Sequence, residues 1–176
     1  IEKTAAMSWG FVPLTRYQGG GPEAVLEPLK EHLKDYHQLM IQYYGAGVQA
    51  CYRGPRLFDS EETRIMVQET LDWYKKYRDV LNADMIQLRR PDGRDWDGFL
   101  HVNPDGKHKG FVMLYNPTKE IMQRKITLPL YYTGISKIAN LTSKDGKKKA
   151  ISLSPTKDIT LDFTIAPDSY TWFLIE

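Results

Sequence analysis

The spacing of apolar residues changes its period part-way along the chain. From Leu29 to Tyr43 and again from Val67 to Leu81, apolar residues recur at steps of three and four, as expected of helices that bury one side. Beyond Leu81, short segments alternate apolar and polar residues, as expected of strands that bury one face. The sequence therefore predicts an α/β part in residues 1–83 and an all-β part in residues 84–176.

Two helices are predicted in the first part. One spans residues 22–44, and Gly45 stands where a left-handed residue can end it. The other spans residues 60–81, and either Asp59 or Ser60 can accept a hydrogen bond at its amino end. For Asp59, this capping role is the better interpretation than a catalytic one.

A short apolar run precedes each predicted helix. These runs, Thr4–Trp9 and Val48–Tyr52, are expected to be strands, and residues 11–21 are expected to be irregular. Strand, helix, strand and helix in this order are the repeat of a parallel α/β fold. Two strands cannot close a barrel or fill a doubly wound sheet, and parallel strands need cover on both faces. Because residue 1 is also not Met, we expect the carboxyl-terminal piece of a longer polypeptide.

The all-β part is predicted to be an antiparallel sandwich. About eight short strands at 8–12-residue spacing are typical of that fold. Residues 103–106 form a hairpin turn, and the lysine-rich residues 143–149 form a solvated turn. The expected strands are 84–88, 99–102, 110–115, 121–130, 135–141, 150–153, 159–165 and 170–175.

The composition limits the classes of binding partner and cofactor that we expect. The net charge is +2, which gives no sign of a nucleic-acid surface. The sequence has no run of 18 apolar residues, so no membrane-spanning helix is expected. Cys51 is alone and the four His are scattered, so we expect no disulfide framework, no metal and no cofactor.

The carboxyl ends of parallel strands lie at one edge of a sheet, where such folds bind ligands. That edge is expected to bring together Trp9, Tyr52, Arg53 and Arg56. Aromatic rings stack on the C–H faces of sugars, and guanidinium groups donate hydrogen bonds to hydroxyls. These four residues are the candidate substrate-binding residues, with a carbohydrate as substrate. The alternative is that Trp9 and Tyr52 are core residues and that Arg53 pairs with Asp59 as a structural clamp.

Several strings together resemble one family of enzymes, the bacterial α-galactosidase-like glycoside hydrolases. The resemblance covers essentially all 176 residues, and the most specific string is Arg-Pro-Asp-Gly-Arg-Asp-Trp-Asp-Gly at 90–98. It is a family mark rather than a catalytic motif. The strings are Tyr52–Asp59, Trp73–Arg78, Arg89–Gly98, Leu114–Thr118, Leu128–Gly134 and Tyr170–Trp172.

The resemblance implies a (β/α)8 barrel followed by a carboxyl-terminal β-sandwich. Residues 1–83 would then supply the last two βα units, and residues 84–176 the sandwich. Two Asp carboxylates on earlier barrel strands would act as nucleophile and acid/base, and no residue of this sequence matches them, so the catalytic residues are unknown. The implied partner is the remaining amino-terminal part of the same enzyme, and the implied location is periplasmic or extracellular in a bacterium. The alternative is a non-catalytic carbohydrate-binding or structural sandwich.

Overall fold

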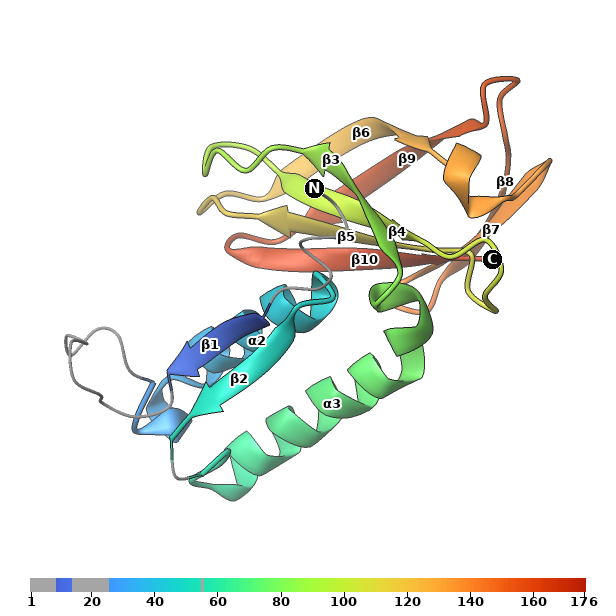
Figure 1. Cartoon of the computed structure of the whole chain (residues 1–176). Coiled ribbons are helices and arrows are strands. Elements are labelled where there is room, and N and C mark those ends of the chain that lie inside the picture. Colours follow the sequence, from blue (N-terminus) through green and yellow to red (C-terminus); the bar gives the residue numbers. More distant parts are fainter. Residues whose placement is uncertain (1–8, 14–25, 55) are drawn as a thin grey trace. The chain divides into compact units, whose positions relative to one another are not determined.

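The structure is a computed structural model that describes residues 9–13, 26–54 and 56–176 (Figure 1). The described residues divide into two compact units, one that ends at Arg78 and one that comprises Asp79–Glu176. No helix in these ranges has both the length and the apolar character needed to cross a membrane.

The first unit contains a parallel strand pair and two longer helices. Strand β1 (Trp9–Pro13) pairs with β2 (Gln49–Arg53). A short 3-10 turn, η2 (Leu29–Glu31), precedes helix α2 (Leu33–Gly45), and helix α3 (Glu61–Leu81) follows β2. The chain thus alternates strand and helix and holds its two described strands parallel, as the sequence predicts for an α/β segment.

Three boundaries in the first unit differ from the prediction. Residues 4–8 of the expected strand and 22–25 of the expected helix lie outside the described residues. Residues 26–28 are not helical and α2 begins only at Leu33, so the expectation of a helix through residues 26–32 is wrong. Strand β1 runs on to Pro13, so the expectation that residues 11–13 are irregular is wrong. Its apolar Phe11 and β-branched Val12 suit a strand, and a proline can stand at a strand end because it has no N–H to pair.

The end of α2 also differs. Gly45 is the last helical residue, and Gly47 adopts the left-handed conformation, with φ +67°. The N–H of Gly47 donates to the carbonyl of Tyr44 at 3.2 Å, which closes the turn into β2. The prediction placed the left-handed residue two positions too early, because both glycines suit it and the sequence does not show where the last helical hydrogen bond falls.

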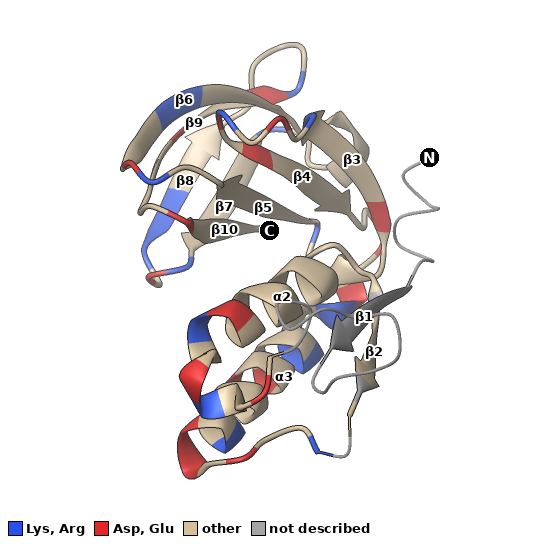
Figure 2. Cartoon of the chain, turned by 90° about the vertical axis from the view of Figure 1, so that its left-hand side faces the viewer, with Lys and Arg blue, Asp and Glu red and all other residues tan. Residues whose placement is uncertain are grey.

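Helix α3 begins as predicted. The N–H of Thr63 donates to Ser60 Oγ at 3.2 Å, and the N–H of Ser60 donates to Thr63 Oγ1 at 3.0 Å. This reciprocal pair satisfies two backbone N–H groups that the helix itself cannot. Figure 2 shows both signs of charge along α3, as expected of a helix that buries one stripe and leaves the rest in water. The core of this unit is formed by Leu29, Tyr36, Met40, Tyr44 and Val67.

Residues 84–176, all of which are described, form eight antiparallel strands. Six make one sheet in the order β3-β4-β5-β10-β7-β8, and β6 and β9 make a second. A 3-10 turn, η3 (Tyr131–Thr133), joins β6 to β7. The strands are β3 (Asp84–Arg89), β4 (Asp97–Val102), β5 (Gly110–Asn116), β6 (Met122–Pro129), β7 (Ile138–Ser143), β8 (Lys148–Ser152), β9 (Asp158–Ile165) and β10 (Ser169–Ile175).

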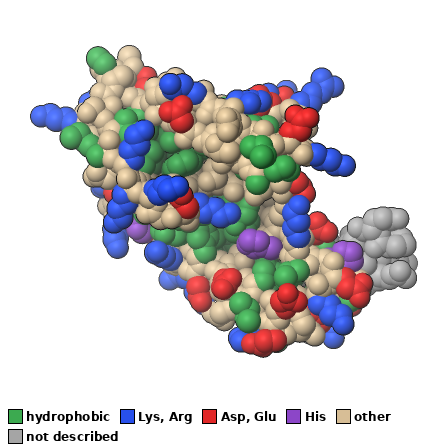
Figure 3. All heavy atoms as spheres, turned by 180° about the vertical axis from the view of Figure 1, so that it is seen from behind, with side chains coloured by type: hydrophobic (Ala, Val, Ile, Leu, Met, Phe, Trp, Pro, Cys, Tyr) green, Lys and Arg blue, Asp and Glu red, His purple; other side chains and the backbone are tan. Residues whose placement is uncertain are grey.

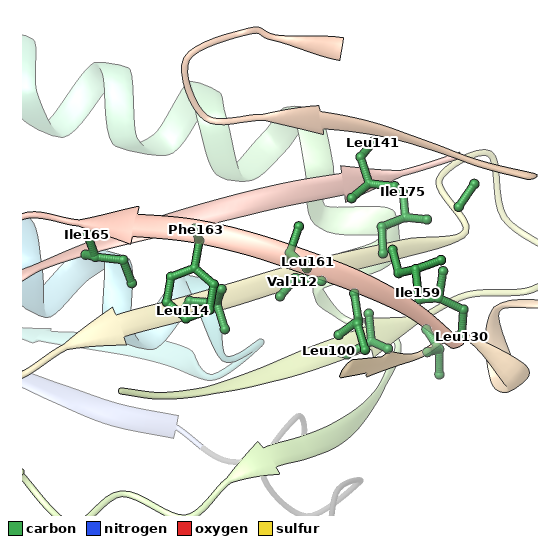
Figure 4. Close-up of a cluster of buried hydrophobic side chains, with 13 residues drawn as sticks. Leu100, Val112, Leu114, Leu130, Leu141, Ile159, Leu161, Phe163, Ile165 and Ile175 are labelled. Carbon is green, nitrogen blue, oxygen red and sulfur yellow. The ribbon is translucent and has the colours of Figure 1, made fainter. Parts of the chain in front are cut away.

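The hydrophobic core of this unit lies between its two sheets (Figure 4). Strand β9 alternates without a break, so that its four buried apolar residues all face the larger sheet. This is the arrangement of a β-sandwich, and it confirms the antiparallel sandwich that the sequence predicts. The buried cluster is Leu100, Val102, Val112, Leu114, Leu128, Leu130, Ala139, Leu141, Ile159, Leu161, Phe163, Ile165 and Ile175.

The opposite face of the larger sheet carries aromatic side chains. Phe111 of β5 stacks on Trp172 of β10 with 5.1 Å between ring centroids. Tyr115 contacts Phe99 on one neighbouring strand at 5.9 Å and Tyr170 on the other at 6.5 Å. Because cross-strand aromatic pairs stabilise a sheet, these contacts support the pairing of β4, β5 and β10 on the face of the sheet that lies opposite the core.

Truncating a core residue should destabilise the sandwich. Leu114 is fully buried, so we expect Leu114→Ala to lower the free energy of unfolding by about 2–5 kcal/mol through lost burial and a residual cavity. Ile121→Ala, at an exposed position of the same unit, should change it by less than about 0.5 kcal/mol. Urea denaturation of the two variants checks this, and equal midpoints would contradict the assigned core.

Candidate functional site

The candidate site follows strand β2, where the chain leaves Arg53 and enters the loop to α3. Tyr52, the residue before, is half-buried and packs against the core of its unit. Its hydroxyl lies 2.7 Å from the hydroxyl of Tyr44 on α2, and the Tyr44 ring stacks on Tyr74 of α3 at 4.6 Å between centroids. Tyrosines from β2, α2 and α3 therefore contact one another next to the carboxyl end of β2.

The environment keeps the phenol of Tyr52 protonated. Burial raises its pKa far above the ordinary value of 10.0, and the hydrogen bond with Tyr44 raises it further. Burial also raises the pKa of Tyr44, although the bond to Tyr52 acts in the opposite direction. Tyr52 can therefore donate or accept a neutral hydrogen bond but cannot serve as a base. Its packing agrees with the interpretation of Tyr52 as a core residue.

Arg56 lies exposed on the loop, and its Nε donates to Glu27 Oε1 at 3.1 Å. Exposed ion pairs of this kind contribute about 0–1 kcal/mol, so the contact adds little stability. A guanidinium carries five N–H donors, so one hydrogen bond to Glu27 leaves donor capacity for sugar hydroxyls. This geometry is compatible with the predicted binding role.

Asp59 is committed to local structure. Its Oδ2 accepts the backbone N–H of Lys30 at 3.2 Å, and its Oδ1 accepts the hydroxyl of Thr63 at 3.1 Å. Burial raises the pKa of Asp59, but these hydrogen bonds outweigh it and hold the pKa below 3.8. The carboxylate thus ties η2 to the start of α3, whereas the backbone N–H of Thr63 in α3 is capped by Ser60 Oγ, the other residue that the sequence offered as a cap. A pairing with the Arg53 side chain lies outside the described residues.

The same loop exposes an aromatic residue that the sequence reasoning did not select. The Phe58 side chain is 45% exposed, and its neighbour Leu57 is exposed as well. The loop is held where the buried hydroxyl of Tyr36 donates to the Leu57 carbonyl at 3.0 Å. An aromatic residue in an otherwise polar loop after a strand was the available signal, and Phe58 joins Arg56 as a candidate.

The strand register separates Trp9 from the other candidates. Trp9 pairs with Gln49 at one end of the parallel pair, and Pro13 pairs with Arg53 at the other. Four residues along a strand span about 13 Å, because each adds roughly 3.3 Å. The expectation that Trp9 ends its strand beside Arg53 is therefore wrong. That these residues bind substrate stays a prediction.

The string at 89–98 forms a self-bonded loop between β3 and β4. Asp92 accepts the N–H groups of Arg94 and Asp95 with Oδ1, at 2.9 and 3.1 Å, and a 2.7 Å bond from Arg89 Nη2 with Oδ2. Arg89 Nη1 also donates to the Trp96 carbonyl at 2.7 Å. The Arg89 guanidinium and the two backbone N–H groups hold the pKa of Asp92 far below its usual range. The string therefore acts as a structural loop.

The glycine that closes this string has a steric reason. A Cβ at Gly98 would stand 2.2 Å from the carbonyl oxygen of Met113 on the paired strand β5, which no side chain can occupy. Glycine here lets the β4 and β5 backbones approach each other closely. The last residue of the string at 90–98 is therefore explained by packing.

One histidine lies between two carboxylates. His108 is buried, with Nδ1 3.0 Å from Asp79 Oδ1 and Nε2 3.9 Å from Glu176 Oε1. Asn103 Nδ2 also donates to the Asp79 carbonyl at 3.0 Å, so the cluster joins loop 103–109 to the end of α3. Within the described ranges, no group of three or more His, Cys, Asp or Glu side chains is placed to hold a metal ion.

No family model and no curated protein matches the sequence. Solved structures match the fold: a GH27 β-L-arabinopyranosidase from Geobacillus stearothermophilus (TM-score 0.57, 14% identity, 96% of this chain and 37% of that one) and α-galactosidase I from Mortierella vinacea (0.57, 12%, 85% and 38%). An α-amylase from Geobacillus thermoleovorans also matches (0.52, 12%, 80% and 32%).

These comparisons establish a likeness of fold. Over most of its length the chain has the fold of α-galactosidase-like glycosidases, at low identity. It spans about a third of the length of these structures. Because an α-amylase shares the fold, the likeness alone does not select a sugar.

Removing the Asp59 carboxylate should loosen the start of α3. Because it accepts hydrogen bonds from the N–H of Lys30 in η2 and from the hydroxyl of Thr63 in α3, we expect Asp59→Ala to lower the free energy of unfolding at pH 7 by about 0.5–1.5 kcal/mol. Glu62→Ala, an exposed residue of the same turn, is the control and should have a smaller effect.

The effect of Asp59 should also depend on pH. Its folded pKa lies below the ordinary 3.8, so its contribution is complete above that value and is lost as the pH falls through the folded pKa. Stability measured from pH 7 downward should show the wild-type protein and Asp59→Ala converging in acid. A difference that grows in acid would contradict the ionised, hydrogen-bonded carboxylate.

Proposed function

We propose that this chain is the carboxyl-terminal part of an α-galactosidase-like glycoside hydrolase that acts on O-glycosidic bonds. Residues 1–83 are the last two βα units of a (β/α)8 barrel, and residues 84–176 are the accessory β-sandwich that follows it. The observation that carries the proposal is the fold likeness to a GH27 glycosidase, which extends over 96% of the chain.

The strand pair supports the barrel assignment. β1 and β2 are parallel, and parallel strands of five residues occur in sheets that further strands and helices cover on both faces. The loop that follows β2 would then lie at the active-site end of the barrel. Arg53 and Arg56 would donate hydrogen bonds to sugar hydroxyls there, and Phe58 would offer a ring for stacking.

The catalytic pair is expected from the amino-terminal remainder of the enzyme. Glycoside hydrolysis needs two carboxylates, about 5–5.5 Å apart in retaining enzymes. The acidic groups described beside the β2 loop already have partners: Asp59 binds Lys30 and Thr63, and Glu27 binds Arg56. The chain would therefore shape the edge of the substrate site without performing the chemical step.

The alternative of a non-catalytic sugar-binding sandwich predicts a row of exposed Trp and Tyr along one sheet. Instead, Phe163 lies in the core between the sheets, and Trp172 is buried against Phe111. The larger sheet therefore does not present the open row of aromatic rings that this alternative predicts, although the turn η3 outside the sheets exposes two tyrosines.

The chain by itself should hydrolyse no glycoside. We expect the purified 176-residue protein to release no nitrophenol from 4-nitrophenyl α-galactoside, because the catalytic carboxylate pair is expected in the amino-terminal remainder of the enzyme. The assay needs protein made in a host that lacks α-galactosidase, with an active α-galactosidase as positive control. Turnover that copurifies with the chain would contradict the proposed division of labour.

In the complete enzyme, Arg53→Ala should harm substrate handling more than folding. Losing a charged hydrogen bond of about 1.5–3 kcal/mol corresponds to a fall in kcat/KM of about 10- to 100-fold. Arg78→Ala, an exposed arginine on α3, is the matched control and should keep kcat/KM. The opposite pattern, unchanged activity per folded molecule with a Tm lower by several degrees, would make Arg53 a structural clamp.

A further inference from the structure

Two neighbouring tyrosines stand out on the surface of the sandwich. Tyr131 and Tyr132 form the 3-10 turn η3, and their side chains are 68% and 63% exposed. Their rings meet edge to face, with 5.3 Å between centroids and 87° between planes. Figure 3 shows charged side chains of both signs on one face of the molecule, with hydrophobic side chains among them. Single exposed apolar residues are normal, but two adjacent aromatic residues that are each about two thirds exposed are less common.

The turn that carries these rings is firmly anchored. The flanking residues Leu130 and Thr133 are fully buried, and the Thr133 hydroxyl donates to the Leu130 carbonyl at 2.6 Å. The N–H of Leu130 donates to the carbonyl of Lys157 at 2.9 Å, which attaches the turn to the loop before β9. Gly134 ends the turn in the left-handed conformation, with φ +75°. Because the backbone is fixed in advance, a ligand of these rings meets little ordering cost.

The size of the exposed aromatic surface favours a small ligand. A tyrosine offers about 150–250 Å², so two rings exposed by some two thirds present roughly 200–330 Å². A stable protein interface needs about 800 Å² from each partner, which is far more. One or two pyranose rings match the available area.

The chemistry of the pair fits a sugar. The face of one phenol can stack on the C–H face of a pyranose, and the perpendicular ring closes the side. The two hydroxyls add donors and acceptors for the hydroxyls of the sugar. Beside the turn, the Lys157 ammonium donates a hydrogen bond to the Ser136 carbonyl at 2.6 Å. The position of this polar group next to the tyrosines is therefore fixed as well.

We propose that Tyr131 and Tyr132 form a carbohydrate-binding site on the sandwich for an exposed pyranose of a polysaccharide. The choice of a sugar rests partly on the proposed function of the chain. The site itself involves binding only and needs no catalytic carboxylate.

Affinity electrophoresis of the full 176-residue chain tests the site. Native gels that contain soluble galactomannan, with α-galactosyl side groups, or soluble starch, with α-glucosyl units, form the two arms. We expect retardation in at least one polymer, and Tyr131→Ala/Tyr132→Ala should weaken the apparent affinity about tenfold or more, equivalent to about 1.4 kcal/mol. Ile121→Ala, which removes an equally exposed apolar side chain, should keep the retardation.

Conservative variants separate stacking from hydrogen bonding. Tyr131→Phe/Tyr132→Phe retains both rings and should keep the affinity within about threefold to fivefold of wild type. An affinity as low as that of the alanine variant would overturn the stacking argument. No retardation in either polymer, or equal retardation of wild type and the alanine variant, would overturn the site. This readout does not depend on hydrolysis. A negative result here would therefore overturn the binding site without testing the proposed function, which the nitrophenol assay and the Arg53→Ala variant test separately.

Discussion

The layer of apolar side chains between the two sheets of the sandwich is the interaction on which the folded carboxyl-terminal unit depends. Its members come from six strands (β4, β5, β6, β7, β9 and β10) and from Leu130, which follows β6. Strands β6 and β9 contribute one side of this layer although they pair only with each other. No strand of that two-stranded sheet pairs with a strand of the larger one, and side-chain contacts such as the 3.3 Å hydrogen bond from Asn116 Nδ2 of β5 to the Ile165 carbonyl of β9 only supplement the apolar layer. Local features such as the close backbone approach at Gly98 and the anchored turn η3 depend on the packing of this layer.

The local part of the structure could be predicted, because it depends on local patterns. The alternation in β9 and the capping residue of α3 are both readable from a few neighbouring positions. The partners of each strand could not be predicted, since β10 lies between β5 and β7 and brings together segments far apart in the sequence. The sequence left residues 131–134 between two expected strands, which agrees with the position of η3, but it did not show that they form a 3-10 turn.

The candidate site shows the same difference between local features, which the sequence predicts, and tertiary contacts, which it does not. The sequence indicated that Tyr52 lies at the carboxyl end of a strand, but it could not show that Tyr52 meets Tyr44 through their hydroxyls, since that contact needs α2 to be in place. Trp9 was assigned to the wrong end because its strand continues to Pro13. A boundary error of four residues moves a side chain from one edge of a sheet to the other. The sequence left Asp59 and Ser60 open as caps of α3, and the structure shows that Ser60 accepts the helix N–H while the Asp59 carboxylate binds the Lys30 N–H and the Thr63 hydroxyl.

The central claim is that this chain shapes a glycosidase site but does not carry the catalytic carboxylates. A mechanism-based label tests it most directly: an α-galactose-configured cyclitol epoxide, which forms an ester with the nucleophile of a retaining enzyme, reacted with the complete enzyme and located by peptide mass spectrometry. The account predicts that the labelled carboxylate lies amino-terminal to the 176 residues of this chain. A label on any Asp or Glu within these residues would contradict it.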